Sequence, residues 1–285
     1  MTIDQAKEEY FVQADINENC LNIAHLNSIP PSYWSISRCD GMNFKIIELD
    51  QDSSIFQSIQ HYFRSGWNRD KIGVGRDGNG MTHNSFDIKK IWRVENSLLW
   101  RSYASRRHEI DYQEDQFFQN QICKDLSISN DKNEAILFHG APCGLGDTEN
   151  IIDIVIHQGF DERMSTKGMF GSGIYFAWQS SKSDCYSGRY QDSSIGETAK
   201  IILSRVCLGK FYETSSYMGS LRRPPCVNNC EGSCSHERCD SVWYDGSGRN
   251  YKECIIYDRN LCYPEFVIEY ERTFEGGEEE KKGEN

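Results

Sequence analysis

The chain has 285 residues, of which 38% are hydrophobic and 12% aromatic, and its formal net charge is −12. This composition excludes a globally disordered chain, and the length is sufficient for a sizeable core in one large domain or two small ones. No apolar run reaches the roughly 18 residues that a membrane span requires, so no membrane partner is expected. The excess of acidic residues disfavours nucleic acid as a partner without excluding a local contact.

The beginning of the chain, MTIDQAKEEY, has neither the basic stretch nor the apolar stretch of a secretory signal. The sequence contains 12 cysteines, in a chain too long to need a disulfide framework. We therefore expect an intracellular protein in a reducing compartment. Nucleus and cytoplasm both stay open, because no strong basic targeting run is present. The oligomeric state also stays open.

The first part of the chain predicts two strands and two helices. Residues 1–40 have no clear periodicity and are expected to be a lead-in segment. The predicted strands cover 42–49 and 86–94, and the helices follow Ser53-Ser54 and Asn96-Ser97, whose side chains can cap a first turn. The apolar residues that set these patterns are Ile55, Ile59 and Phe63 in the first helix and Phe86, Ile88, Trp92 and Val94 in the second strand, where Lys90 interrupts the alternation.

The second part of the chain predicts a larger number of short strands. Short helices are expected at 151–157, ended by Gly159, and at 180–186, and residues 219–250 resemble a long loop. Many short strands with few long helices argue against a doubly wound parallel sheet and favour an α+β fold. The predicted strands are 135–140, 173–177, 200–208 and a closing pair at 253–257 and 265–271.

One catalytic-sized domain over residues 41–272 is the simplest organisation, because neither an internal repeat nor a clear linker divides the chain. Residues 273–285 are rich in glutamate and are predicted to form an acidic disordered tail. Residues 73–78 match the pattern GxGxxG. The dinucleotide fingerprint needs a helix directly after it, and the next residues are instead rich in Gly and Asn, so a flexible loop is favoured.

Three separated segments contain residues that suit a nucleotide-binding site. His139 ends the apolar strand LFHG beside Gly140, and a glycine at that place lets a ligand approach the backbone. The glycine-rich segment GMFGSGIYFA, residues 168–177, contains Tyr175. Glu253 begins the apolar strand ECIIY, where a charged side chain needs a partner. Each residue alone is more often an ordinary core or strand-end side chain, so only their combination is specific.

In this order the segments resemble the catalytic domain of the poly(ADP-ribose) polymerase family, the diphtheria-toxin-like ADP-ribosyltransferases of the His-Tyr-Glu type, and within that family the tankyrases. The resemblance covers about residues 40–272. It implies an α+β fold in which two packed, mainly antiparallel sheets form an NAD cleft with short flanking helices. The segments that carry it are LFHG, QGFDER, GMFGSGIYFAWQSSKSDCY, SRVCLGK and ECIIYDRNLCYPEFVIEY, with FDIKKIWRVENSLLWRSYASRRHEI upstream.

The resemblance implies a catalytic triad of His139, Tyr175 and Glu253. The histidine would hold the adenosine ribose of NAD+, two tyrosines would flank the nicotinamide ring, and a glycine backbone and a serine hydroxyl would hold its carboxamide. The glutamate would accept a hydrogen bond from the 2′-hydroxyl of the nicotinamide ribose. A carboxylate suits this place, because cleavage of the glycosidic bond develops positive charge on the ribose. The residues implied for NAD+ binding are His139, Gly140, Tyr175, Ser183 and Tyr186.

The implied activity is transfer of ADP-ribose from NAD+ to protein side chains, including those of the protein itself, with release of nicotinamide. Glutamate at position 253 is the pattern of chain-extending members, so polymer synthesis is favoured. Lys182 could contact the acceptor or be a solvated side chain. Three alternatives stay open: an NAD+ glycohydrolase, a mono-ADP-ribosyltransferase acting on protein or on nucleic-acid ends, and a non-catalytic NAD-binding interaction module.

A cysteine-rich loop, residues 226–239, contains a candidate metal site. Its candidate ligands are Cys226, Cys230, Cys234 and Cys239, with His236 as an alternative. Thiolates and imidazoles are ligands that zinc prefers, so the pattern favours a structural Zn²⁺ over free thiols or disulfides. The zinc site of tankyrase is expected before the strand that corresponds to 200–208, whereas this loop follows it, and its ligands are therefore not carried over. Such an ion would fix the loop without taking part in the glycosyl chemistry.

Overall fold

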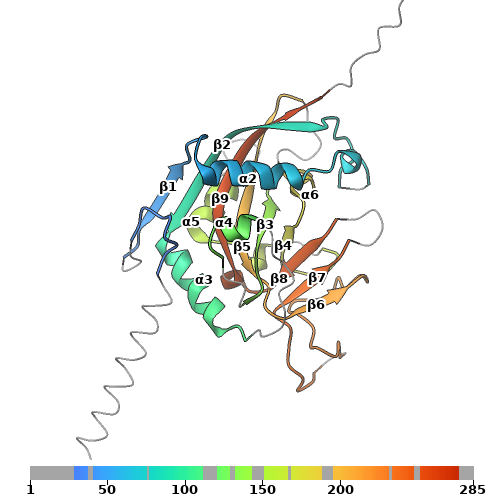
Figure 1. Ribbon diagram of the computed structural model, residues 1–285. Helices are drawn as coiled ribbons and strands as arrows, with labels where there is room; N and C mark the ends of the chain where they lie inside the picture. The colour runs from blue at the N-terminus through green and yellow to red at the C-terminus, as the bar shows by residue number, and fades with distance from the viewer. Residues whose placement is uncertain are drawn as a thin grey trace, which may run out of the picture.

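In the residues that the computed structural model describes, nine strands form one hydrogen-bonded sheet (Figure 1). Most of the predicted lead-in segment and of the predicted acidic tail lies outside these residues. The described residues are 29–37, 41–75, 77–111, 121–128, 132–142, 151–165, 168–187, 195–230, 233–246 and 251–275. In sheet order the strands are β1 (Phe44–Glu48), β2 (Ser85–Asn96), β9 (Cys262–Thr273), β5 (Thr198–Cys207), β3 (Glu134–Gly140), β4 (Ile174–Ala177), β8 (Glu253–Ile256), β7 (Ser241–Tyr244) and β6 (Phe211–Thr214).

The predicted α+β class is confirmed, and the sheet is mainly antiparallel. Every pair of neighbouring strands is antiparallel except β6 and β7. Strands β3 and β4 share a single residue pair, Phe138 with Ala177. The two predicted sheets are therefore two halves of one hydrogen-bonded series, joined at this narrow contact.

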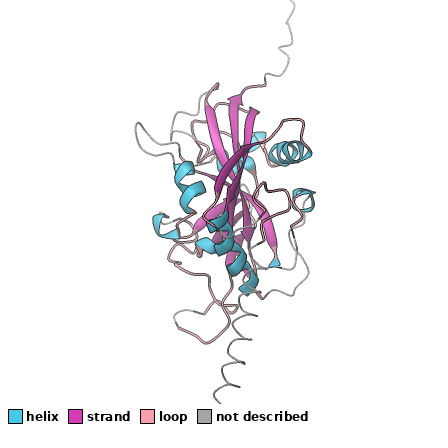
Figure 2. Cartoon of the chain, turned by 90° about the vertical axis from the view of Figure 1, so that its left-hand side faces the viewer, coloured by secondary structure: helices cyan, strands magenta, loops and turns pink. Residues whose placement is uncertain are grey.

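Helices cover both faces of the sheet (Figure 2). Strand β5 illustrates the division, since successive side chains of a strand point to opposite faces. Ile202 and Val206 join the apolar cluster that includes α3 and α5, whereas Ile201 and Leu203 join the cluster that includes α2 and α4. The helices are α2 (Ser54–Ser65), α3 (Ser97–Glu109), α4 (Gln121–Asp125), α5 (Ile151–Gln158) and α6 (Ser180–Asp184), with 3₁₀ turns at Arg69–Lys71, Glu162–Met164 and Arg259–Leu261.

Strand β2 confirms the strand predicted over 86–94 and explains its interrupted pattern. Its pairing with β9 shifts register between Ile88 and Lys90. A bulge of this kind moves the side chains that follow it to the other face of the sheet. Ile88 accordingly packs in the cluster with α2, whereas Trp92 and Val94 pack in the cluster with α3.

The sequence pattern misses two short strands, β6 and β7. Strand β7 lies inside 219–250, where the sequence predicts a loop, and its four residues are buried. A serine followed by three apolar residues, set among glycines and cysteines, is too short a run to predict a strand, so the strand depends on its pairing partners. The predicted closing strands exist as β8 and β9, but they are not neighbours in the sheet, because β8 pairs with β4 and β7.

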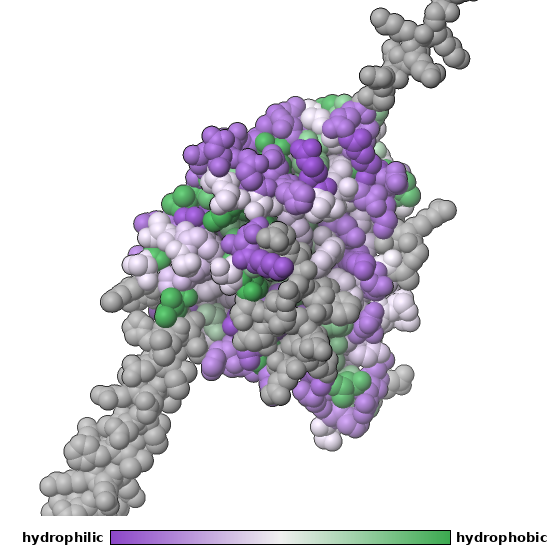
Figure 3. All heavy atoms as spheres, viewed as in Figure 1, coloured by the Kyte–Doolittle hydropathy of each residue, from purple (hydrophilic) through white to green (hydrophobic). Residues whose placement is uncertain are grey.

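The face of the molecule in Figure 3 is mainly hydrophilic, with apolar residues scattered over it. Apolar side chains exposed singly are usual on folded proteins. In the described part of the chain, no helix has the length and apolar character needed to cross a membrane.

Helix α3 begins at the cap that the sequence predicts. The Asn96 Oδ1 atom accepts a hydrogen bond from the Leu99 N–H at 3.2 Å. Its Nδ2 atom donates to the carbonyls of Ile156 and His157, in the last turn of α5, at 3.0 and 3.1 Å. One buried side chain therefore serves the free main-chain groups of two helix ends.

We expect Asn96→Ala to lower the free energy of unfolding by about 2–3 kcal/mol, because it removes a cap and leaves buried carbonyls without partners. The control is Ser53→Ala, which removes the cap of α2, where the Ser53 hydroxyl accepts from the Phe56 N–H, and an exposed bond from the same hydroxyl to the Asp50 carbonyl. That variant should lose about 1 kcal/mol. Urea unfolding followed by tryptophan fluorescence measures both, and equal losses would contradict the double role of Asn96.

Candidate active site

Helix α6 contains Ser183, which is predicted to bind NAD+, and the adjacent Lys182. Buried polar contacts hold this helix in place. The fully buried Asp184 accepts hydrogen bonds from the Tyr270 hydroxyl and, at 2.9 Å, from Arg272 Nε of β9. Its other oxygen lies 2.7 Å from His83 Nε2. The Ser180 hydroxyl donates to a main-chain carbonyl of α2 at 2.7 Å. These bonds join α6 to three separate parts of the chain.

His139 lies one residue before the end of β3, as predicted. Its Nδ1 atom is 2.8 Å from the carbonyl oxygen of Tyr175. A carbonyl can only accept, so Nδ1 carries the proton and Nε2 is an acceptor. The ring packs against Phe160 and Phe176, with centroids 4.9 and 5.6 Å away. Burial lowers the pKa of His139 despite the bond to the Tyr175 carbonyl, so the imidazole is neutral at pH 7.

Tyr175 of β4 uses both functions of its phenol. The oxygen accepts from the Phe170 N–H at 2.9 Å and donates to the Gly171 carbonyl at 2.8 Å. Burial raises the pKa of Tyr175 to about 12, against the opposing bond from Phe170. A Cβ atom added at Gly168 would lie 2.5 Å from the phenol oxygen. Tyr175 is thus a neutral, fixed aromatic side chain that holds the glycine-rich segment.

Gly140 meets the main chain of α6. A Cβ atom at this position would lie 1.9 Å from the carbonyl oxygen of Ser183, so only glycine fits. That carbonyl also accepts from the Tyr186 N–H at 3.0 Å. The close approach expected at Gly140 is therefore made by the protein itself, and it places the buried Ser183 directly against the end of β3.

Glu253 begins β8, as predicted, and its side chain is 12% exposed. The Lys182 ammonium lies 3.5 Å from Glu253 Oε1 and 2.7 Å from Asp77 Oδ2. Burial raises the pKa of Glu253, and Lys182 opposes that rise. Burial also acts to lower the pKa of Lys182, but Glu253, Tyr186 and Asp77 together outweigh burial and the pKa is raised. Lys182 is therefore a buried cation between two carboxylates and not a solvated side chain.

Tyr186 follows α6 and keeps 39% of its surface exposed. The Lys182 ammonium donates to its phenol oxygen at 3.2 Å and lies 4.9 Å from its ring centroid. The same ammonium lies 5.9 Å from the ring centroid of Tyr251. An exposed ring held at one edge is suited to stacking on a flat ligand.

The predicted site residues form two contact groups that β4 connects. In the first, His139 bonds to the main chain of Tyr175. In the second, Glu253 and Tyr186 share the Lys182 ammonium. Ala177 of β4 pairs with Glu253 in the sheet. The structure therefore brings the predicted residues onto four adjacent elements, β3, β4, β8 and α6.

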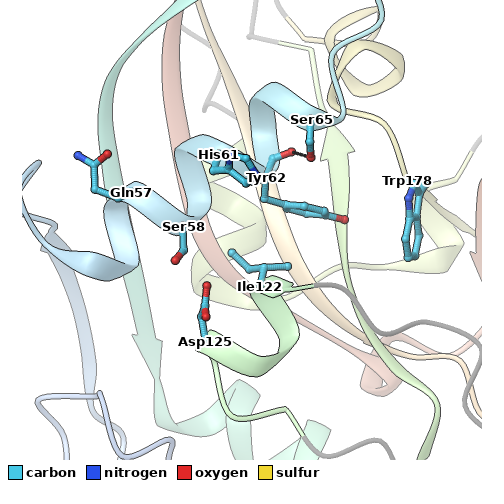
Figure 4. Close-up of a pocket in the computed structure, with 8 residues that line it drawn as sticks. All are labelled: Gln57, Ser58, His61, Tyr62, Ser65, Ile122, Asp125 and Trp178. Atoms are coloured by element: carbon cyan, nitrogen blue, oxygen red, sulfur yellow. Dashed lines mark hydrogen bonds between the residues drawn. The ribbon is translucent and has the colours of Figure 1, made fainter.

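A hollow of about 450 Å³ lies elsewhere, between α2 and α4 (Figure 4). None of the residues predicted for the triad or for NAD+ binding lines it. Figure 4 shows Tyr62 pointing from α2 toward Trp178, which follows β4. The hollow is therefore not the predicted NAD cleft, which stays a prediction. The lining residues are Gln57, Ser58, His61, Tyr62, Ser65, Ile122, Asp125 and Trp178.

Residues 75–272, which hold all the elements of this site, match the model of the family described as the poly(ADP-ribose) polymerase catalytic domain. The chain belongs to this family. The resemblance predicted from the sequence is thus confirmed for the poly(ADP-ribose) polymerase family, whereas the particular likeness to tankyrase stays a prediction.

Curated relatives of this poly(ADP-ribose) polymerase domain have low identity over most of the chain. "Protein mono-ADP-ribosyltransferase PARP12" of Mus musculus is 24% identical over 260 residues, 90% of this chain and 29% of that protein. "Probable poly [ADP-ribose] polymerase DDB_G0278045" of Dictyostelium discoideum is 27% identical over 240 residues, 84% of this chain and 59% of that protein. "Protein mono-ADP-ribosyltransferase PARP11" of Homo sapiens is 27% identical over 213 residues, which are 67% of this chain and 53% of that protein. The chain spans less than two thirds of each of these relatives.

The structure forms a four-residue cluster in the cysteine-rich loop. The ligand atoms of Cys226, Cys230, Cys234 and His236 all lie within 4.8 Å of one another. The Cys230 N–H bonds to Cys226 Sγ at 3.2 Å, and this bond is the main cause that lowers the pKa of Cys226 to about 6. Cys239, predicted as a ligand, is buried outside this group, and His236 takes its place.

Two contributors to the site have no signal in the sequence. Asp77 belongs to the stretch for which the sequence favours a flexible loop, yet it supplies the shorter of the two ion pairs of Lys182. Tyr251 precedes β8 at a position with no recognisable pattern. Only the fold brings these residues to Lys182, since they are far apart along the chain.

We expect Lys182→Gln to raise the pKa of Glu253 further, because the variant removes the cation that opposes the effect of burial. Carboxyl ¹³C shifts followed through a pH titration measure the change. The matched control is Lys252→Gln, whose ammonium pairs with Asp245 at 2.8 Å. The interpretation fails if both variants move the pKa of Glu253 equally.

Proposed function

We propose that the protein is an NAD+-dependent ADP-ribosyltransferase that modifies protein side chains, its own included. The observation that carries this proposal is the buried Glu253 carboxylate beside the Lys182 ammonium, one strand from Tyr175. Family membership supports the reaction class, and the names of relatives such as "Protein mono-ADP-ribosyltransferase PARP12" point the same way. Residues 41–272 would be the catalytic unit, since β1 pairs with β2 along its whole length.

The proposed site residues divide the work of holding NAD+. The Nε2 atom of His139 is an acceptor and suits a ribose hydroxyl of the adenosine half. Tyr175 and the exposed ring of Tyr186 suit the two faces of the nicotinamide. The main chain of Gly140 and the Ser183 hydroxyl would hold the carboxamide. These contacts position the dinucleotide before any bond breaks, and they need no covalent intermediate.

In the proposed reaction the bond from the ribose C1′ to the nicotinamide nitrogen breaks, and its electron pair leaves with nicotinamide. The positive charge that develops on the ribose is stabilised by the Glu253 carboxylate. An acceptor oxygen then forms a bond to C1′. A hydroxyl acceptor gives its proton to Glu253, which acts as a general base.

The charge of Glu253 depends on Lys182. A buried carboxylate without a cation tends to take up a proton. The ammonium, which also pairs with Asp77, keeps the carboxylate available as an anion within the same group of side chains. Lys182 therefore acts on the reaction through Glu253 and is a positioning residue.

We propose further that the transfer continues to chains of ADP-ribose. The support is Glu253 itself, since glutamate at this place is the pattern of chain-extending members. Two of the relatives are named mono-ADP-ribosyltransferases, so the length of the product is the decisive observation. We propose Zn²⁺ as the ion of the cysteine cluster, with no part in the glycosyl chemistry.

We expect Glu253→Gln to lower the rate of nicotinamide release about 10²–10³-fold, because an amide does not stabilise a cation as a carboxylate does. Thermal unfolding is the control, since the amide keeps the shape of the side chain. The measurement is nicotinamide released from NAD+, together with a denaturing gel and mass spectrometry of the modified protein. Unchanged release in the variant would exclude Glu253 from the reaction, whereas no release from the wild-type chain would favour a binding module.

The same gel separates the competing products. Polymer gives a ladder that rises from the protein, and single transfer gives one discrete shift. Free ADP-ribose without modified protein identifies a glycohydrolase. A transfer to nucleic-acid ends requires label on added oligonucleotides, which the wild-type protein should not produce. A single discrete shift from the wild-type chain would overturn the proposal of chain extension. The proposal that the protein is an ADP-ribosyltransferase would then still hold.

We expect nicotinamide release to fall as the pH decreases through the pKa of Glu253, since the protonated acid cannot stabilise a cation. Burial places this pKa above the ordinary value of 4.5. The acid limb of the pH–rate profile should therefore have its midpoint above pH 4.5. In Lys182→Gln the midpoint should lie higher still. An acid limb at or below the ordinary carboxyl pKa would contradict this assignment.

A further inference from the structure

The connection between β6 and β7 has an unusual form. The two strands are parallel, with Phe211 opposite Ser241 and Thr214 opposite Tyr244. Parallel neighbours need a long crossover, which is usually a helix. Here residues 215–240 make the crossover, and their described part, 215–230 and 233–240, contains no helix. Figure 1 shows the crossover as an orange-brown loop below β6, β7 and β8.

In the described outer part of this crossover, residues 227–230 and 233–238, no residue is buried. Residues 227–230 and 235–237 are exposed. A long irregular segment with exposed side chains loses much conformational entropy when it is held in one shape. Interactions other than apolar burial must therefore hold the outer part of the crossover in one shape.

The four-residue cluster lies in this exposed stretch and has the form of a zinc site. Tetrahedral Zn²⁺ with bonds of about 2.3 Å to sulfur separates its ligand atoms by about 3.8 Å. All four ligand atoms lie within 4.8 Å of one another, and Cys230 Sγ is 3.3 Å from His236 Nδ1. The Cys230 N–H donates to Cys226 Sγ, which is the kind of bond that orients a thiolate toward an ion. Three thiolates and one imidazole complete the set.

Residues 218–221, at the start of the same crossover, are hydrogen-bonded to the glycine-rich segment that the Tyr175 phenol contacts. The Ser172 N–H donates to the Leu221 carbonyl at 2.9 Å, and the Met218 N–H donates to the Met169 carbonyl at 2.9 Å. A Cβ atom on Gly171 would lie 1.9 Å from that Leu221 oxygen. The Tyr175 phenol bonds to the other side of the segment, at Phe170 and Gly171.

The outer and inner parts of the crossover are joined by main-chain bonds. The Cys239 N–H donates to the Pro225 carbonyl at 3.0 Å, and the Val227 N–H donates to the Glu237 carbonyl at 3.0 Å. Arg238 also donates to the Pro224 carbonyl at 3.3 Å. The chain from Leu221 to the cluster is thus short, and it is hydrogen-bonded to the returning chain at Pro224, Pro225 and Val227.

We propose that a Zn²⁺ ion held by Cys226, Cys230, Cys234 and His236 stabilises the crossover, which has no helix in its described part. Through the crossover, the ion supports the glycine-rich segment 168–173 that the Tyr175 phenol contacts. The ion closes the outer loop, the loop holds Leu221, and Leu221 holds the segment 168–173. The consequence for nicotinamide binding rests on the proposed transferase function, whereas the metal site and its support of residues 168–173 do not.

Metal content tests the ligand set. The full chain, purified without chelators, should contain one Zn²⁺ per molecule by mass spectrometry of the metal. Cys234→Ala should lose most of it, and so should His236→Ala. The matched control is Cys239→Ala, a cysteine of the same loop that lies outside the cluster, which should keep its zinc. Full zinc in Cys234→Ala, or equal loss in Cys239→Ala, overturns this ligand set.

Reversible chelation of the wild-type chain tests the support of Tyr175 without relying on a variant that folds. Removal of zinc should speed amide exchange at Ser172 about tenfold and leave the amides of β5 unchanged, and added Zn²⁺ should restore the slow exchange. Trypsin cleavage after the exposed Arg222 should accelerate in parallel. If zinc leaves and neither rate changes, the support of the segment by the ion is excluded.

Nicotinamide release in the same samples separates this inference from the proposed function. Bound zinc with slow Ser172 exchange and no nicotinamide release would reject the transferase and keep the metal site. Nicotinamide release from a chain that never binds zinc would reject the metal site and keep the transferase. Where both hold, chelation should raise the KM for NAD+ more than it lowers kcat, because the loop acts on the binding wall and not on Glu253.

Discussion

The ion pair of Lys182 with Glu253 is the constraint on which the rest of the site depends. A buried carboxylate is stable as an anion only where a cation and hydrogen bonds replace the water it has lost. Lys182 supplies that cation at 3.5 Å, and Asp77 holds the ammonium from the other side at 2.7 Å. With two anions around one cation, the group carries a net negative charge, which suits a reaction that develops positive charge on its substrate.

The place of Lys182 depends on the contacts that hold α6. Asp184, two residues later, lies in the buried group with Arg272 and His83, and Gly140 leaves no space between β3 and the Ser183 carbonyl. A helix of five residues has little stability of its own. Its position therefore comes from tertiary contacts, and each of them also fixes the distance from the ammonium to Glu253.

The sequence predicts the parts of this arrangement that depend on local patterns. Alternating and helical periodicities predict β2, β3, β5 and α2, and the side chains of Ser53 and Asn96 mark two helix starts that the structure confirms. The parts that it misses depend on contacts distant in sequence. Strand β7 is too short to stand out, and the role of Asp77 exists only once its loop reaches α6. His236 is named from the sequence as an alternative ligand, but only the fold of the crossover groups it with the three cysteines in place of Cys239.

The candidate site lies where the sheet has its shortest strand pairing, between β3 and β4. Strands β3 and β4 share one residue pair, so their main chains diverge where a continuous ladder would otherwise keep them together. His139 and Tyr175 lie on either side of this join, and the bond from the imidazole to the Tyr175 carbonyl partly takes the place of ladder bonds. Side chains can reach outward from such a seam without competing with strand pairing. A join of this kind provides less support from the sheet than an ordinary strand pair, so β4 needs support from elsewhere. The Tyr175 phenol, the glycine-rich segment and the crossover behind Leu221 are placed to provide it.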